Sequence, residues 1–173
     1  MRKTLLLFTT MALALLLAAG TAWAALPAPT VVSTVPSGTT GVDPAADIRA
    51  TFSEAMSTKS LGICNHCTST SSSKTFYLLP GNFTALSPTK NPPRFCTNTA
   101  TGTTAPCPTP IPATVSYNAG TFTAILNPSS TLLPNTTYTA VVEGTADGDF
   151  VAVKDTGGTP MATDYIFHFT TAP

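Results

Sequence analysis

The chain has 173 residues with 8 basic and 8 acidic side chains, so its formal net charge is zero, and 16 prolines and 11 glycines interrupt it. The few charges are scattered singly, so no basic patch favours binding to nucleic acid or to an anionic membrane surface. Thr, Ser, Pro and Gly dominate after residue 24, where long helix-forming runs of Ala, Leu, Glu and Lys are missing. This composition favours an all-β protein.

The first 24 residues have the layout of a secretory signal peptide. Arg2 and Lys3 precede an apolar run over residues 5–19, and Ala-Trp-Ala at 22–24 forms a cleavage site of mostly small residues. The apolar run has about 15 residues, fewer than the roughly 20 that a membrane-spanning helix needs. We therefore expect cleavage after residue 24 and export to the cell surface, the periplasm or the medium. Subtracting 24 from 173 leaves one mature domain of 149 residues, 25–173, with a formal charge of −2.

Seven short segments of the mature chain alternate between apolar and polar residues, which is typical of strands with one buried face. In residues 47–52, for example, Ile48, Ala50 and Phe52 fall on one face. The segments are TVVST (30–34), DIRATF (47–52), TFYLL (75–79), ATVSY (113–117), TFTAILN (121–127), TYTAVVE (137–143) and YIFHFTT (165–171). The turn at 118–120 predicts a hairpin between the fourth and fifth, and one helical turn is expected after the second. Together they predict an antiparallel β-sandwich of about seven strands.

The segment LLPNTTY, residues 132–138, predicts a tyrosine corner before the sixth strand. Leu132, Pro134 and Tyr138 fall at alternate positions, together with Thr136. In a tyrosine corner the ring packs into the core and the hydroxyl group bonds the backbone a few residues upstream. The alternative is a Pro-Asn turn before a strand that begins with a tyrosine.

Three stretches carry a family resemblance. They are PTVVSTVPSGTTGVDPAADIRATFSEAM (29–56), PATVSYNAGTFTAILNPSSTLLPNTTYTAVVEG (112–144) and VKDTGGTPMATDYIFHFTT (153–171). On these residues the chain resembles the SbsA-type bacterial immunoglobulin-like (Ig-like) domains of S-layer proteins. The resemblance implies an Ig-like β-sandwich that serves as a spacer or adhesive unit, because one fold hosts many functions. Domains of this kind have about 100 residues, and the excess here falls into two insertions, at about 62–74 and 80–112.

All four cysteines lie in these insertions, with the spacing C-x2-C-x28-C-x10-C: Cys64, Cys67, Cys96 and Cys107. Haem c attachment needs a histidine directly after the second cysteine, where this chain has Thr68. A zinc ribbon needs two C-x2-C pairs, but the second pair here is ten residues apart. A thioredoxin-like centre needs its first cysteine at a helix N-terminus, whereas a Thr/Ser-rich coil follows ICNHC at 63–67. A metal or redox role for the first pair stays as an alternative.

Disulfides are the expected state of these cysteines, because an exported chain with an even cysteine count usually forms them. We expect two bridges, each removing of order 3 kcal/mol of loop entropy from the unfolded chain. The third predicted strand, which has five residues, separates the points where the two insertions begin by about 17 Å. This separation favours bridges within each insertion, which pair Cys96 with Cys107 and Cys64 with Cys67. The chain could still fold back over that distance, so three connectivities stay open.

Binding is predicted at the second insertion, where Phe83, Arg94 and Phe95 combine aromatic rings with a guanidinium group. Such residues concentrate in the hot spots of protein interfaces. We expect a surface protein or a glycan as the partner, and no nucleic acid.

Candidates for catalysis or metal binding are few. His168 faces away from its two phenylalanine neighbours on the last strand and is expected at a surface or interface. Asp147, Asp149 and Asp155 lie in a Gly-containing connector and could supply oxygen ligands to calcium, although Asp is also common in polar turns. We therefore predict no enzyme activity and no cofactor. The expected function is a secreted or cell-surface structural and adhesion module, with a self-associating S-layer or fibre subunit as the alternative.

Overall fold

The computed structural model of the protein describes residues 27–63, 75–87, 95–145 and 152–173. Over these ranges the protein has ten strands and no α-helix. The strands are β1 (Val31–Val35), β2 (Ile48–Phe52), β3 (Phe76–Pro80), β4 (Phe83–Ser87), β5 (Phe95–Asn98), β6 (Thr104–Pro106), β7 (Ala113–Asn118), β8 (Thr123–Pro128), β9 (Thr137–Val142) and β10 (Tyr165–Thr170). No helix in the described ranges is long and apolar enough to cross a membrane.

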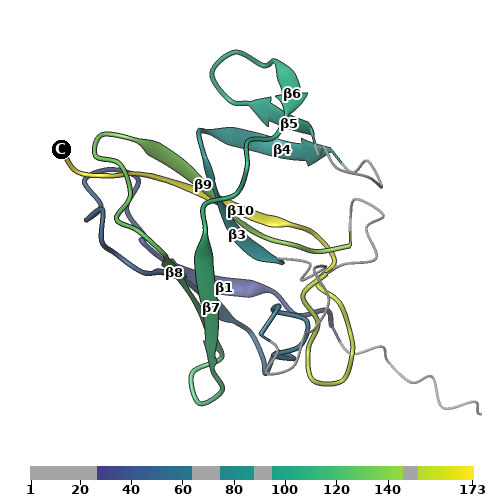
Figure 1. Ribbon diagram of the computed structural model, residues 1–173. Helices are drawn as coiled ribbons and strands as arrows, with labels where there is room; N and C mark the ends of the chain where they lie inside the picture. Colours follow the sequence, from purple (N-terminus) through teal and green to yellow (C-terminus); the bar gives the residue numbers. More distant parts are fainter. Residues whose placement is uncertain (1–26, 64–74, 88–94, 146–151) are drawn as a thin grey trace, which may run out of the picture.

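Seven of the strands form two antiparallel sheets (Figure 1). One sheet has the order β1-β2-β8-β7 and the other the order β10-β9-β3. In an Ig constant-type domain, the first, second, fifth and fourth strands share one sheet, and the third, sixth and seventh share the other. The arrangement here is the same once β4, β5 and β6 are set aside. The predicted all-β Ig-like sandwich is therefore confirmed, and the seven predicted segments coincide with these strands to within two residues.

The main core lies between the two sheets and is built from alternate residues of each strand. On β2 these are Ile48, Ala50 and Phe52, the three predicted to share a face, and all are at most 2% exposed. Opposite them lie Tyr138 of β9 and Phe169 of β10, whose ring centroids are 5.8 Å apart. Burial of these apolar side chains is the main force that holds the two sheets together.

The expected helical turn after β2 is present as a single turn. The N–H of Leu61 donates to the carbonyl of Ser57 at 3.2 Å, and the Leu61 side chain is buried in the main core. The turn goes no further, because Gly62 follows with a φ of 76°, a backbone conformation that favours glycine.

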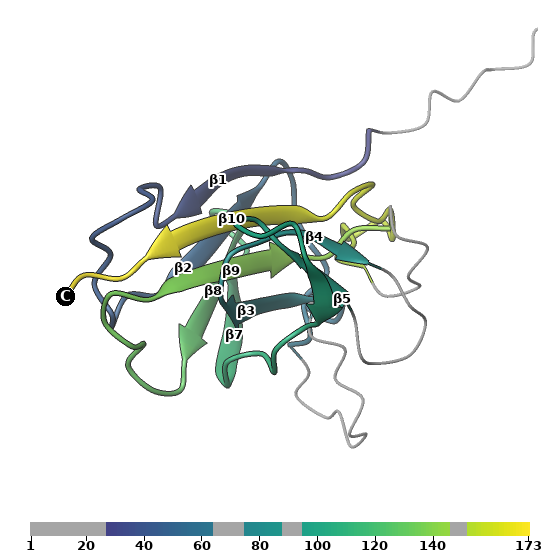
Figure 2. The same ribbon diagram turned by 90° about the horizontal axis from the view of Figure 1, so that it is seen from above.

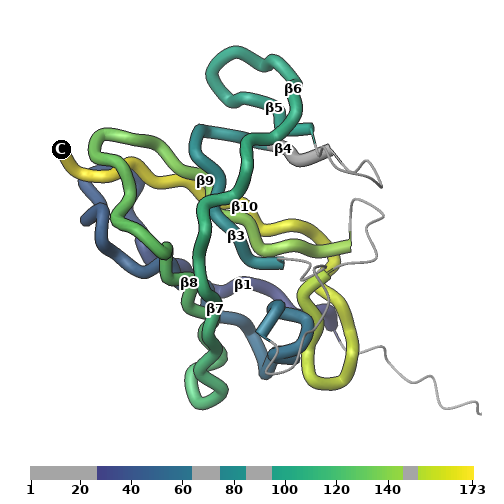
Figure 3. The backbone as a smooth tube through the Cα atoms, viewed as in Figure 1, coloured from purple at the N-terminus to yellow at the C-terminus, as the bar shows by residue number. Residues whose placement is uncertain are grey.

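The second insertion differs from the expectation of a plain loop. Residues 83–106 contain three short strands, in a third antiparallel sheet of order β4-β5-β6. Seen from above, β4 and β5 lie over β10, β9 and β3 (Figure 2). The backbone tube leaves β3, forms this small sheet and returns to β7 (Figure 3). The domain therefore has a third layer beside the two sheets of the sandwich.

Candidate functional site

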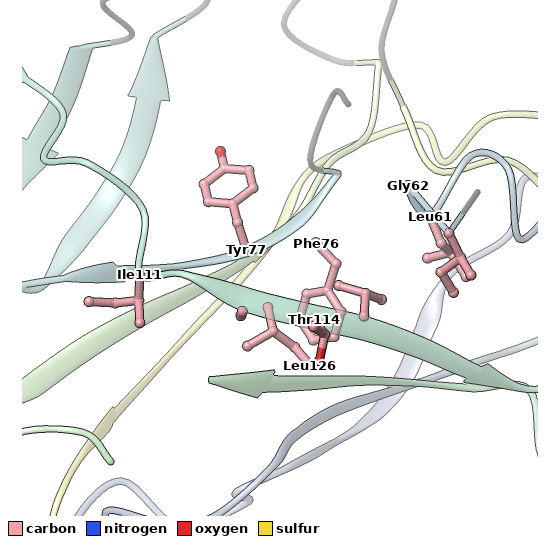
Figure 4. A pocket seen from close by; sticks show the side chains of 10 residues that line it. Leu61, Gly62, Phe76, Tyr77, Ile111, Thr114 and Leu126 are labelled. Carbon is pink, nitrogen blue, oxygen red and sulfur yellow. The ribbon is translucent and has the colours of Figure 1, made fainter. Parts of the chain in front are cut away.

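The outer face of the β10-β9-β3 sheet carries Thr139 and His168 but also a group of apolar side chains. Tyr77 and Leu79 of β3, Val141 of β9 and Ile166 of β10 point away from the main core. Phe76 and Tyr77 indeed project to opposite sides of β3 (Figure 4). The outer face of an antiparallel sheet usually carries polar residues that contact water, so this apolar group needs a cover.

The second insertion provides that cover. Cys96 of β5 packs with Tyr77, Leu79 and Val141 in a second hydrophobic cluster, and Phe83 lies against it. Leu79 and Cys96 are each only 1% exposed. This cluster was not predicted from the sequence, although β3 and β9 carry the apolar runs FYLL and AVV, which are typical of strands buried on both faces.

A disulfide between Cys96 and Cys107 closes the insertion, with the two Cα atoms 4.9 Å apart. This pair belongs to the connectivity that the spacing of the insertion roots favours. Because Cys107 also lies against the second cluster, the disulfide is part of the contact between the insertion and the sheet. Cys64 and Cys67 lie outside the described residues.

Polar contacts fix the start of the insertion to the same sheet. The Thr139 hydroxyl group donates to the carbonyl of Gly81 at 2.7 Å and accepts from the N–H of Phe83 at 3.0 Å. His168 Nε2 lies 2.7 Å from the carbonyl oxygen of Phe83 and must donate, because a carbonyl only accepts. His168 is therefore at the contact between sheet and insertion, where it has a structural partner.

The far face of the insertion is rich in exposed hydroxyl groups. Thr97 and Thr104 place their hydroxyl oxygens 3.0 Å apart across β5 and β6, and those of Thr101 and Thr103 are 2.7 Å apart. The turn between the strands is held by Asn98, whose side-chain oxygen accepts two backbone N–H groups. Residues 95–106 of this face carry no charged side chain, and their hydroxyl groups can donate to and accept from a partner.

The residues predicted to bind a partner occupy different places. Phe83 is half-buried and packs against the second cluster. Phe95 is also half-buried, but strand alternation puts it on the face of β5 opposite Cys96, toward the outside of the insertion. Arg94 lies outside the described residues.

The segment predicted as a tyrosine corner places Tyr138 in the main core with 2% of its surface exposed. Its hydroxyl oxygen accepts the N–H of Leu133 at 2.9 Å, five residues upstream. Leu132 is buried beside it, and Pro134 is exposed in the turn.

Asp155 acts within its own turn. It is 5% exposed, and its carboxylate accepts the N–H of Thr159 at 2.7 Å. Asp147 and Asp149 lie outside the described residues. Within the described ranges no three His, Cys, Asp or Glu side chains lie close enough together to hold a metal ion.

An apolar hollow of about 290 Å³ opens between the edges of β3 and β7 (Figure 4). Leu61, Phe76, Ile111, Val115 and Leu126 are among the residues that line it. Among the described residues that line the hollow, none is charged.

The chain is similar to one family of known proteins and to several solved structures. The family described as "Bacterial Ig-like domain" matches residues 27–171. Three structures of the S-layer protein SbsC are similar in fold. The structure of rSbsC(31-844) is 20% identical in sequence, has a TM-score of 0.40 and covers 84% of this chain. The structure of SbsC domains 1–6 is 18% identical, has a TM-score of 0.42 and covers 85% of this chain. The structure of the N-terminal part of SbsC is 20% identical, has a TM-score of 0.41 and covers 84% of this chain. This chain spans only 14%, 14% and 24% of those three chains, respectively. Among curated proteins, none matches it significantly.

Proposed function

Because the chain belongs to the bacterial Ig-like domain family, we propose that it is an exported, non-catalytic structural module of the cell surface. In this proposal the module belongs to the SbsA type within that family and presents its second insertion to a surface protein or a glycan. The segment 1–24 is the signal peptide, and the mature module begins at residue 25.

The observation that carries this proposal is the attachment of the insertion. Its inner face is buried in the second cluster and closed by the Cys96–Cys107 disulfide, while its outer face exposes hydroxyl groups. A preformed surface loses little conformational entropy when it binds, which favours recognition. His168 and Asp155 each have backbone partners, which supports a structural rather than a catalytic role for them.

Binding to isolated envelope material tests the proposal. The oxidised mature protein is mixed with peptidoglycan sacculi or with surface-protein extracts of the producing bacterium, and the bound fraction is measured after sedimentation. We expect Phe95→Ala and Arg94→Ala to weaken binding. Phe122→Ala is the matched control, because it removes an exposed phenylalanine from the turn between β7 and β8, far along the chain from the insertion.

The proposal fails if wild type does not bind, if both insertion variants bind as tightly as wild type, or if the control loses as much binding as they do. Export is tested separately by fractionating the producing cells. Mature protein outside the cytoplasm with an N-terminus at residue 25 is the expected result, and uncleaved cytoplasmic protein would contradict it.

A further inference from the structure

The hydrogen bonds between β5 and β6 decide which of their side chains lie closest together. The N–H of Asn98 donates to the carbonyl of Thr103 at 2.9 Å. The even-numbered residues of β5 therefore bond to β6, because antiparallel pairs alternate between hydrogen-bonded and non-hydrogen-bonded positions. Side chains come closest at the non-hydrogen-bonded positions. Here these are Phe95 opposite Pro106 and Thr97 opposite Thr104.

The first of these pairs is apolar. Strand alternation places Phe95 on the face of β5 opposite Cys96, which is 1% exposed, so Phe95 and Pro106 lie on the outside of the insertion. A residue at the position of Pro106 directs its N–H away from β5, so the proline costs the sheet no hydrogen bond. Phe95 is half-buried and Pro106 is exposed. An aromatic ring and a pyrrolidine ring therefore lie at opposite positions of the two strands, and we call them the ring pair.

The second pair consists of hydroxyl groups. The Oγ1 atoms of Thr97 and Thr104 are 3.0 Å apart. Because one hydrogen lies between the two oxygens, the other hydroxyl hydrogen and the remaining lone pairs can bond to a ligand. Thr97 follows Phe95 by two residues on the same face, which separates the hydroxyl pair from the ring pair by about 7 Å along the strand. In the turn that follows, the exposed Thr101 and Thr103 repeat the arrangement, with their oxygens 2.7 Å apart.

These side chains are held in place in the free protein. The hydrogen bonds between the hydroxyl groups fix their directions, and threonine has few rotamers about χ1. The disulfide between Cys96 and Cys107 closes the segment that carries them. Such a surface loses little conformational entropy when a ligand binds.

The chemistry of the ring pair and of the hydroxyl pairs favours an uncharged sugar. A sugar ring presents C–H groups on its faces, which pack on apolar rings, and hydroxyl groups around its edge, which bond to other hydroxyl groups. Residues 95–106 contain no charged side chain, and the chain after residue 24 has a net negative charge, so an anionic polymer is disfavoured. A protein partner fits less well, because threonine is under-represented in the hot spots of protein interfaces.

We propose that the outer face of β5 and β6 binds an uncharged polysaccharide of the cell envelope. One sugar ring stacks on the ring pair, and the next ring along the polymer bonds to the hydroxyl groups of Thr97 and Thr104. This inference rests on the proposed function, in which the insertion binds a surface protein or a glycan, and it decides between those two partners.

Proteinase digestion separates the two kinds of partner. The oxidised mature protein is titrated against envelope material of the producing bacterium before and after exhaustive digestion, with the proteinase removed, and the bound fraction is measured after sedimentation. We expect binding to survive the digestion and to be unchanged in high salt, because no ion pair carries it. Soluble polysaccharide that is released from the digest and is not retained by an anion exchanger should compete for the protein.

Single substitutions locate the site. Thr97→Val and Thr104→Val each replace a hydroxyl group with a methyl group and keep the branched side chain, and each should weaken binding about twofold to tenfold, the effect of one lost hydrogen bond. Phe95→Leu removes the ring and should weaken binding by at least as much, whereas Phe95→Tyr should bind as wild type does. Thr123→Val is the matched control, because it breaks a hydroxyl pair of the same length, 3.0 Å to Thr51, on the four-stranded sheet.

The possible failures are distinguishable. If wild type does not bind undigested material, the proposed function and this inference fall together. If binding is lost after digestion, the proposed function stands with a protein partner and the polysaccharide is overturned. Failure of the uncharged polysaccharide to compete, or binding by both valine variants as tight as that of Thr123→Val, would also overturn the inference. If Thr97→Val unfolds at a lower temperature than wild type, Thr104→Val decides alone, because Thr104 is exposed.

Discussion

Replacing Leu79 with alanine tests whether the outer face of the second sheet is a true core. Leu79 is 1% exposed and lies in the second cluster with Tyr77, Val141 and Cys96. Truncating a fully buried leucine costs about 2–5 kcal/mol, because the apolar contacts are lost and a cavity remains. In a domain of about 150 residues, each kcal/mol lowers the midpoint of thermal unfolding by roughly 2–4 °C. We therefore expect a loss of at least about 2 kcal/mol and a clear fall in the midpoint.

Chemical denaturation monitored by circular dichroism measures this loss, with Leu133→Ala as the matched control. Leu133 is also a leucine beside a strand, but it is 67% exposed, and its truncation should change the stability by less than about 0.5 kcal/mol. If the insertion were a loop over a solvated sheet, Leu79 would be exposed and both variants would behave alike. Equal stabilities of the two variants would refute the reasoning.

Three further changes address other parts of the fold. Tyr138→Phe leaves a backbone N–H without its acceptor and should cost about 1–3 kcal/mol in the same denaturation assay; an unchanged stability would mean that the hydroxyl group is not needed. Reduction of the Cys96–Cys107 disulfide should cost about 3 kcal/mol and speed amide hydrogen exchange in β5 and β6 more than in β2; uniform exchange would contradict a local role. Gly144→Ala would place a Cβ atom against the backbone of Thr163, so we expect this variant to fold poorly. The measurement is the yield of soluble protein, which should be low. A normal yield would show that the backbone can shift to make room.

The strands of the sandwich could be predicted because alternation is a local property of the sequence. Ile48, Ala50 and Phe52 share one buried face, as the pattern indicates, and each strand was found to within two residues. The helical turn and the LLPNTTY segment depend on neighbouring residues in the same way. Signals of this kind can be recognised without knowing what packs against them.

The third layer could not be predicted because it depends on contacts between distant residues. β4, β5 and β6 have only three to five residues each, too few for a clear period, and their stability comes from packing on β3 and β9. The available signal was the apolar run FYLL of β3 followed by AVV of β9. Such runs indicate a strand that is buried on both faces, which a two-layer sandwich does not explain.

The candidate site residues also differ in whether their role depends on neighbouring residues or on contacts between distant ones. The pairing of Cys96 with Cys107 was favoured by the separation of the two insertions, although the sequence left three connectivities open, and the structure contains it. Phe83 was considered only as a binding residue, but its carbonyl accepts a hydrogen bond from His168 in the neighbouring layer, and the residue packs against the second cluster. Such a contact over 85 residues cannot be read from either segment alone.

The central claim is that the insertion packs on the outer face of the β10-β9-β3 sheet as a third layer. Nuclear Overhauser effects measured on the oxidised mature protein, with the methyl groups of Leu79 and Val141 assigned, test it most directly. We predict cross-peaks from these methyl groups to side-chain protons of Cys96, Phe83 or Cys107. Methyl groups that show contacts only within the sheet, together with a flexible insertion, would contradict the account.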